Sequence, residues 1–102
     1  MWRSDLTPAE DQLLFNGWTG PAENHKGFVR VSDLAQGMSL FNDALLAECR
    51  ANSLECYDLA SAIPKDTTAF YDDSHFNEGG ARLVARFITD RLLKVAPFHD
   101  SR

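Results

Sequence analysis

The sequence predicts a small, helix-rich α/β fold in which one or two short strands accompany two long amphipathic helices. Apolar residues recur at helical spacing over 34–49, a strand candidate follows at 54–57, and a second helical stripe runs over 81–92. A helix followed by a strand is half of an α/β unit. The 102 residues suffice for one small domain and are too few for two.

The start of the chain carries a helix signal followed by a loop. Thr7 can cap a helix, Pro8 suits the first helical position, and Glu10 completes a capping box. These signals predict a short helix that ends near Phe15. Residues 16–27 contain three Gly, one Pro and two Asn, which predicts a long surface loop.

The middle of the chain is expected to hold an extended segment, a helix and then a strand. Residues 28–31 alternate between apolar and polar and fit the extended segment, and Ser32 is expected to cap the helix that follows. Asn52-Ser53 should end this helix, and 54–57 is the strand candidate. The apolar stripe of the helix consists of Leu34, Met38, Phe41, Leu45 and Cys49.

The last helix is predicted from its capping signals. Asn77 can cap its N-terminus and Glu78 lies favourably in the first turn. Lys94 suits the final turn, and Pro97 blocks further helix. Its predicted buried stripe consists of Ala81, Val84, Ala85, Ile88 and Leu92.

Composition excludes several classes of function. The formal net charge is −5 and no run of Lys or Arg occurs, so a phosphate-binding surface for nucleic acid is not expected. No apolar stretch approaches the roughly 18 residues of a membrane span, and the N-terminus has no signal-peptide pattern. The compartment stays open. Cys49 and Cys56 are interpreted as free buried thiols, because two cysteines make no disulfide framework.

The chemistry is concentrated in Asp72-x-x-His75, in the loop before the last helix. A hydrolytic serine needs a general base, normally His, which a carboxylate holds in one tautomer. A tight turn can fold the Asp72 carboxylate onto the imidazole Nδ1 and leave Nε2 available to accept a proton. Asp73 is the alternative carboxylate if the register differs by one residue.

A metal site is the competing interpretation of the same loop. It would combine His75, Asp72 and Asp73, with His99-Asp100 as further candidates. No His-x-x-x-His or Cys-x-x-Cys spacing supports it, so we expect neither a metal nor a cofactor. His25 and His99 are isolated and are expected to be solvated or structural.

The stretch from Phe70 to Ala85, with Asp72-x-x-His75 followed by Asn77-Glu78-Gly79-Gly80-Ala81, resembles the last conserved block of the SGNH/GDSL hydrolases. Two further stretches match in the family's order, namely Met38-x-x-Phe41-Asn42-x-x-Leu45 and Tyr57-Asp58-Leu59. The resemblance implies the C-terminal portion of a flavodoxin-like α/β fold with one or two parallel strands. It also implies hydrolysis of acyl esters, with His75 as general base and Asp72 as its orienting partner.

On this resemblance, residues 1–102 form a single partial domain with three parts. Residues 1–31 hold a helix and connecting loop, 32–60 a helix and strand, and 61–96 the Asp/His loop and C-terminal helix.

The other blocks of the family are missing. No Gly-Asp-Ser nucleophile motif occurs, and Ser4-Asp5-Leu6 and Ser32-Asp33-Leu34 invert its order and lack a preceding Gly. Asn42-Asp43 has Leu40 where the family's oxyanion block has Gly, and it falls inside a predicted helix. We therefore expect the chain alone to be inactive as an esterase. Its partners would be an ester substrate, once a missing N-terminal half completes the site, or a second copy that covers the apolar stripes. The alternative is a degenerate, non-catalytic module that acts in binding or assembly.

Overall fold

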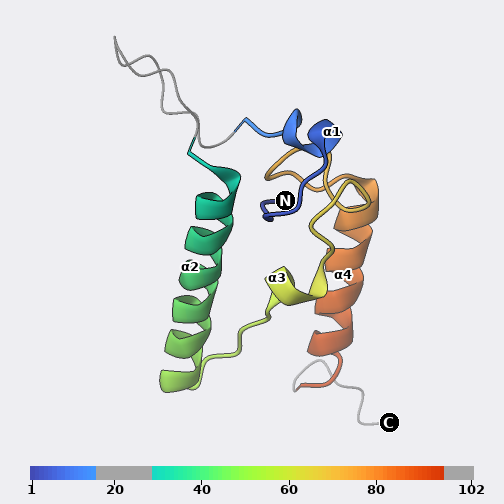
Figure 1. The fold of residues 1–102 in the computed structure, drawn as a ribbon. Coiled ribbons are helices and arrows are strands. Elements are labelled where there is room, and N and C mark those ends of the chain that lie inside the picture. The colour runs from blue at the N-terminus through green and yellow to red at the C-terminus, as the bar shows by residue number, and fades with distance from the viewer. Residues whose placement is uncertain (16–28, 96–102) are drawn as a thin grey trace.

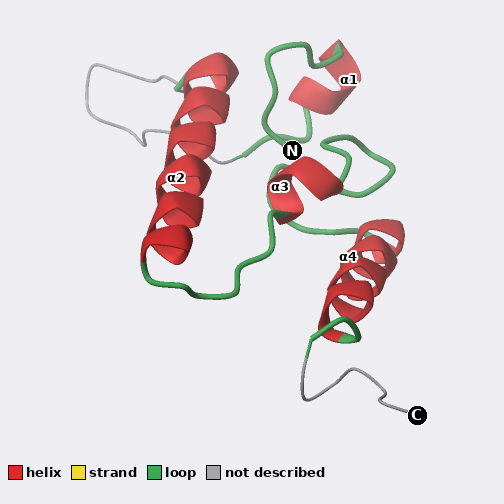
Figure 2. Ribbon diagram, turned by 90° about the horizontal axis from the view of Figure 1, so that it is seen from below, coloured by secondary structure: helices red, strands yellow, loops and turns green. Residues whose placement is uncertain are grey.

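The computed structural model describes residues 1–15 and 29–95, which form four helices joined by loops (Figure 1). The two long helices, α2 and α4, stand apart, and α3 lies between them (Figures 1 and 2). Within the described part of the chain, no two helices pack along a shared face. The helices are α1 (Pro8–Asp11), α2 (Val31–Ala51), α3 (Leu59–Ala62) and α4 (Glu78–Leu92).

The predicted α/β fold is wrong for the residues that the structure describes. They contain no β-strand, and their β-pairing is a single isolated antiparallel bridge between Phe70 and Phe76. The strand candidate at 54–57 has no regular structure, because no described strand pairs with it. Its ends make local backbone hydrogen bonds instead, from the Leu54 amide to the Cys49 carbonyl and from the Leu59 amide to the Tyr57 carbonyl. Of the extended segment proposed at 28–31, residue 28 lies outside the described residues, 29 and 30 have no regular structure, and Val31 already belongs to α2. The flavodoxin-like sheet with one or two parallel strands is therefore absent from 1–15 and 29–95.

The helix boundaries follow the local signals where capping residues are present. Thr7 accepts a hydrogen bond from the Glu10 amide, and Glu10 completes the capping box, as predicted. Asn77 accepts a hydrogen bond from the Gly80 amide and caps α4, also as predicted. The cap predicted at Ser32 is wrong, because α2 already begins at Val31, its cap position is Arg30, and no side chain makes a capping hydrogen bond there. The loop predicted at 16–27, the histidine at 25 and the proline at 97 lie outside the described residues.

Helix α1 is shorter than predicted, and the reason lies at its C-terminal end. It ends at Asp11, and the amides of Leu13 and Leu14 donate to carbonyls three residues back, in tight turns. The next amide, of Phe15, leaves the helical pattern and donates to the carboxylate of Asp73 at 3.2 Å. A long-range contact thus replaces the hydrogen bond that would have continued the helix.

Cys49 and Cys56 form a disulfide, so the interpretation as free thiols is wrong. Helix α2 ends at Ala51, and Ser53 adopts a positive φ of 54° that reverses the chain direction. This reversal returns 54–56 toward the last turn of α2 and brings the two Cα atoms to 6.2 Å, within the usual range for a disulfide. The bridge closes a short loop at the end of α2.

The core is small, and the helical stripes are largely uncovered. The described residues hold no large side chain that is fully buried, and their buried apolar residues are Met1, Cys49, Ile63 and Ala69. On α2, Cys49 is the buried member of the predicted stripe, while Phe41 is 68% exposed. On α4, Ala81 and Ala85 are exposed and the rest of the stripe is partly covered, which contradicts the predicted burial. No sheet among the described residues covers these faces. No described helix combines the length and apolarity of a membrane span.

An ion pair ties the N-terminal segment together and connects it to the loop after α3. The Arg3 guanidinium donates to both carboxylate oxygens of Glu10, at 3.0 and 2.8 Å, and to the Lys65 carbonyl at 2.7 Å. Glu10 is only 8% exposed. Hydrogen bonds from Arg3, then from the Thr7 amide and hydroxyl, lower the pKa of Glu10 from 4.5 to about 2. The ionised carboxylate is therefore the form that the fold stabilises.

Replacing Glu10 with Gln should remove one acid-sensitive contribution to stability. Because the pKa of Glu10 is lower in the folded chain, its contribution is present above pH 4.5 and is lost as the pH falls toward about 2. Urea midpoints measured between pH 2 and pH 6 should decline less steeply in Glu10→Gln than in the parent. Asp90→Asn removes an exposed carboxylate from α4 and serves as the control, which should keep the parent's decline. A decline in Glu10→Gln as steep as in the parent would contradict the assignment.

Candidate functional site

The Asp72–His75 loop is a narrow turn closed at its base. Phe70 and Phe76 pair in the antiparallel bridge, with ring centroids 4.7 Å apart, and the Tyr71 amide donates to the His75 carbonyl at 3.2 Å. The Asn77 amide donates to the Ala69 carbonyl at 2.9 Å, one residue further out. The loop is therefore held where α4 begins.

Side-chain alternation places His75 on the outer side of this loop. Phe70 and Phe76 line an apolar cavity of about 260 Å³ together with Ile63 and Trp2. Because successive side chains of paired segments point to opposite faces, Tyr71 and His75 project away from that cavity. The His75 side chain is 58% exposed. The imidazole is thus accessible to a second group from outside the loop.

The structure brings together the two residues that the sequence pattern singled out. The His75 Nδ1 lies 2.8 Å from Asp72 Oδ2 and 3.1 Å from Oδ1. Oδ1 also accepts the backbone amides of His75, at 2.7 Å, and of Ser74, at 2.9 Å. These backbone hydrogen bonds form the tight turn of an Asp side chain onto its own loop, which explains why a spacing of three residues suffices. The geometry expected from the spacing is present, and the catalytic roles stay predictions.

The electrostatics favour an ionised Asp72. Burial of this carboxyl group opposes its ionisation, but the hydrogen bonds from the Ser74 amide, the His75 amide and the imidazole outweigh burial. Together they lower the pKa of Asp72 below its usual value. A carboxylate at Nδ1 favours the tautomer with its proton on Nδ1, which leaves the Nε2 lone pair available. No hydrogen bond joins Nε2 to any residue in 1–15 or 29–95.

The carboxylate that contacts the imidazole is that of Asp72, so the alternative in which Asp73 orients His75 is not the arrangement observed. Asp73 is 2% exposed and its Oδ2 accepts the Phe15 amide at 3.2 Å. The Met1 amino group donates to its backbone carbonyl at 2.7 Å. The adjacent carboxylates thus have separate contacts, with Asp72 on the imidazole and Asp73 on the N-terminal segment.

Sequence reasoning missed two aromatic residues that lie beside the imidazole. The Tyr71 ring is nearly parallel to it, with centroids 5.6 Å apart and an interplanar angle of 8°. The Phe15 ring is also nearly parallel, at 6.3 Å and 17°. The position of Tyr71, four residues before His75 in a short turn, was a usable signal. Phe15 is 60 residues away in the sequence, and no local pattern points to it.

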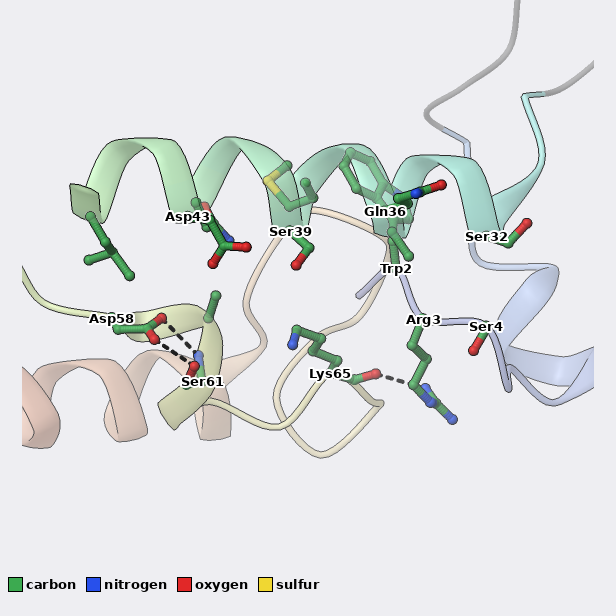
Figure 3. A pocket seen from close by; sticks show the side chains of 15 residues that line it. Trp2, Arg3, Ser4, Ser32, Gln36, Ser39, Asp43, Asp58, Ser61 and Lys65 are labelled. Atoms are coloured by element: carbon green, nitrogen blue, oxygen red, sulfur yellow. Dashed lines mark hydrogen bonds between the residues drawn. The ribbon is translucent and has the colours of Figure 1, made fainter. Parts of the chain in front are cut away.

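The serines considered as nucleophiles do not contact His75. Ser4 and Ser32 line a cavity of about 440 Å³ between α2, α3 and the N-terminal segment (Figure 3), and neither Asp72 nor His75 lines it. Asn42-Asp43 lies within α2 on the same cavity, as expected for helical residues. Ser74 Oγ lies 3.4 Å from His75 Nδ1, the nitrogen that Asp72 already holds. Ser74 is therefore badly placed to give its proton to the imidazole.

The described residues contain no group of three His, Cys, Asp or Glu side chains placed to hold a metal ion. The further candidates of the metal interpretation, His99-Asp100, lie outside the described residues. The arrangement that is present is a carboxylate–imidazole pair in which Asp72 contacts Nδ1 and the His75 side chain is exposed. In comparisons with protein families, curated proteins and solved structures, this chain has no match.

Proposed function

We propose that this chain supplies the general base and its orienting carboxylate to a serine ester hydrolase of the SGNH/GDSL type. The observation that carries the proposal is the contact of 2.8 Å between Asp72 Oδ2 and His75 Nδ1, in a His75 side chain that is 58% exposed. This arrangement is what a base needs, because the carboxylate sets the tautomer and the opposite nitrogen meets the hydroxyl.

The roles follow from the chemistry of acyl transfer. His75 Nε2 would accept the proton of a serine hydroxyl as the serine oxygen attacks the ester carbonyl. The imidazolium, stabilised by the ionised Asp72, would then return the proton to the departing alcohol. A water molecule, activated by the same nitrogen, would then hydrolyse the acyl-serine ester and release the carboxylic acid. The serine and the oxyanion donors must come from polypeptide outside the described residues, because no described serine contacts Nε2.

A hybrid enzyme tests this proposal. The full chain would be joined to the N-terminal segment of an SGNH hydrolase that carries the Gly-Asp-Ser and oxyanion blocks but lacks its own Asp-x-x-His. We expect hydrolysis of p-nitrophenyl acetate, and a loss of about 10²–10⁴-fold in kcat in His75→Ala. The chain alone should hydrolyse this ester no faster than its His75→Ala variant.

The control for the hybrid is His25→Ala, which removes another histidine of the chain and should keep the activity. An active hybrid in which His75→Ala and His25→Ala have equal kcat would contradict the proposal. A purified chain that turns over the ester by itself, with the activity lost in His75→Ala, would contradict the need for a second segment.

A non-catalytic module for binding or assembly is the second candidate, and the exposed apolar face of α2 favours it. Leu40, Phe41 and Leu45 are all more than half exposed on this helix. Such a face is unusual on a monomeric protein and is typical of a surface that another segment or a second copy covers. Sedimentation of the parent and of Phe41→Ser separates the candidates. A concentration-dependent oligomer that the substitution dissociates, together with an inactive hybrid, would favour assembly over catalysis.

A further inference from the structure

The imidazole of His75 needs more than Asp72 to hold its plane. Its side chain is 58% exposed, and exposed ion pairs hold side chains weakly because water competes for both partners. The two oxygens of Asp72 fix the position of Nδ1. They leave the ring able to tilt about that nitrogen, and a tilt moves Nε2. Proton transfer needs alignment within roughly 10–20°.

Tyr71 and Phe15 supply aromatic surfaces nearly parallel to the imidazole, but they are positioned differently. Tyr71 belongs to the same turn, and the hydrogen bond that its backbone amide donates to the His75 carbonyl brings it close without any other segment. Phe15 comes from the N-terminal segment, and its ring needs a tether to stay beside His75. An exposed Phe ring on an untethered segment would have many competing positions.

Asp73 provides that tether. Its buried carboxylate accepts the Phe15 amide at 3.2 Å, and this bond ends the turns that follow α1. Asp73 lies two residues from His75, so the loop that carries the imidazole also holds the backbone of the ring beside it. The N-terminal segment gains a second hold from Arg3, which binds Glu10 and the Lys65 carbonyl.

We propose that Phe15 is a positioning residue that holds the plane of the His75 imidazole, with its own backbone held by Asp73. Its function in catalysis rests on the proposed function above, but its effect on the imidazole does not. Phe15 acts through His75 and takes no part in bond making. The two adjacent carboxylates thus have different roles. Asp72 sets the tautomer of the imidazole, and Asp73 holds the backbone of Phe15 so that its ring stays beside His75.

Nuclear magnetic resonance of the full chain tests the inference without any activity. In Phe15→Ala, the ring protons of His75 should change chemical shift, and its side-chain couplings should move toward values averaged over rotamers. Phe15→Tyr keeps both the ring and the amide and should restore the parent's couplings. Leu13→Ala, a truncation of a similarly exposed apolar residue on the same segment, is the matched control and should leave both unchanged.

Asp73→Ala tests the tether separately and should reproduce the effect of Phe15→Ala on His75. Because Asp73 is buried, this variant can also perturb folding, and Phe15→Ala then decides the matter. His75 couplings that are the same in Phe15→Ala and Leu13→Ala would overturn the inference. In an active hybrid, Phe15→Ala should lower kcat by about 10–100-fold with KM unchanged. An inactive hybrid would count against the proposed function and leave the resonance measurements to judge the inference.

Discussion

Replacing Gly80 with Ala should destabilise the Asp72–His75 loop by at least about 3 kcal/mol. A methyl group on Gly80 would lie 2.0 Å from the Ala69 carbonyl oxygen and 2.8 Å from its carbon. These neighbours are backbone atoms, which cannot turn aside as a flexible side chain can. The same carbonyl accepts the Asn77 amide that closes the loop. The first turn of α4 and the base of the loop would therefore have to separate.

Hydrogen exchange measures this separation locally. In Gly80→Ala, the Asn77 and Gly80 amides should exchange at least about 10²-fold faster than in the parent, as a loss of about 3 kcal/mol requires. Gly37→Ala is the matched control, since a methyl group there meets nothing within 4 Å in the middle of α2. It should stabilise α2 by about 0.5–1 kcal/mol. Equal exchange in both variants at the two amides would refute the close contact.

The parts of the fold that could be predicted depend on residues close in sequence. The caps at Thr7 and Asn77 and the end of α2 at Asn52-Ser53 each rest on hydrogen bonds or dihedral angles within about four residues. A strand and a buried stripe depend instead on what lies across from them. The apolar spacing on α2 has the period of a helix that covers a sheet, but no strand among the described residues lies against it.

The same distinction separates the parts of the candidate site. Asp72 and His75 meet because a three-residue turn is enough to bring them together, so their spacing carried the prediction. Phe15 and Asp73 are 58 residues apart in the sequence, and no periodicity in either segment predicts their contact. The disulfide was missed for a related reason, because counting two cysteines does not reveal the reversal at Ser53 that brings them together.

Asp72→Asn should reverse the tautomer of His75 while leaving the loop closed. The Asn carbonyl oxygen can still accept the Ser74 and His75 amides, which now bond to Asp72 Oδ1. The NH2 group of the Asn side-chain amide cannot accept a hydrogen bond from Nδ1 and would donate one to that nitrogen instead. The imidazole proton would then lie on Nε2. Nitrogen chemical shifts of the neutral ring should then exchange their assignments between the two ring nitrogens.

The same substitution should cost the hybrid enzyme about 10⁴-fold in kcat, because a protonated Nε2 cannot accept the serine proton. Glu78→Gln is the matched control, since it removes one carboxylate next to the loop whose described partner is Arg82 rather than His75. It should keep both the tautomer and the rate. A reversed tautomer with an unchanged rate would mean that His75 is not the base. An unchanged tautomer would mean that the Asn oxygen, in the place of the Oδ1 that lies 3.1 Å from Nδ1, still accepts the hydrogen bond from Nδ1, and that a carboxylate is not needed to set the tautomer.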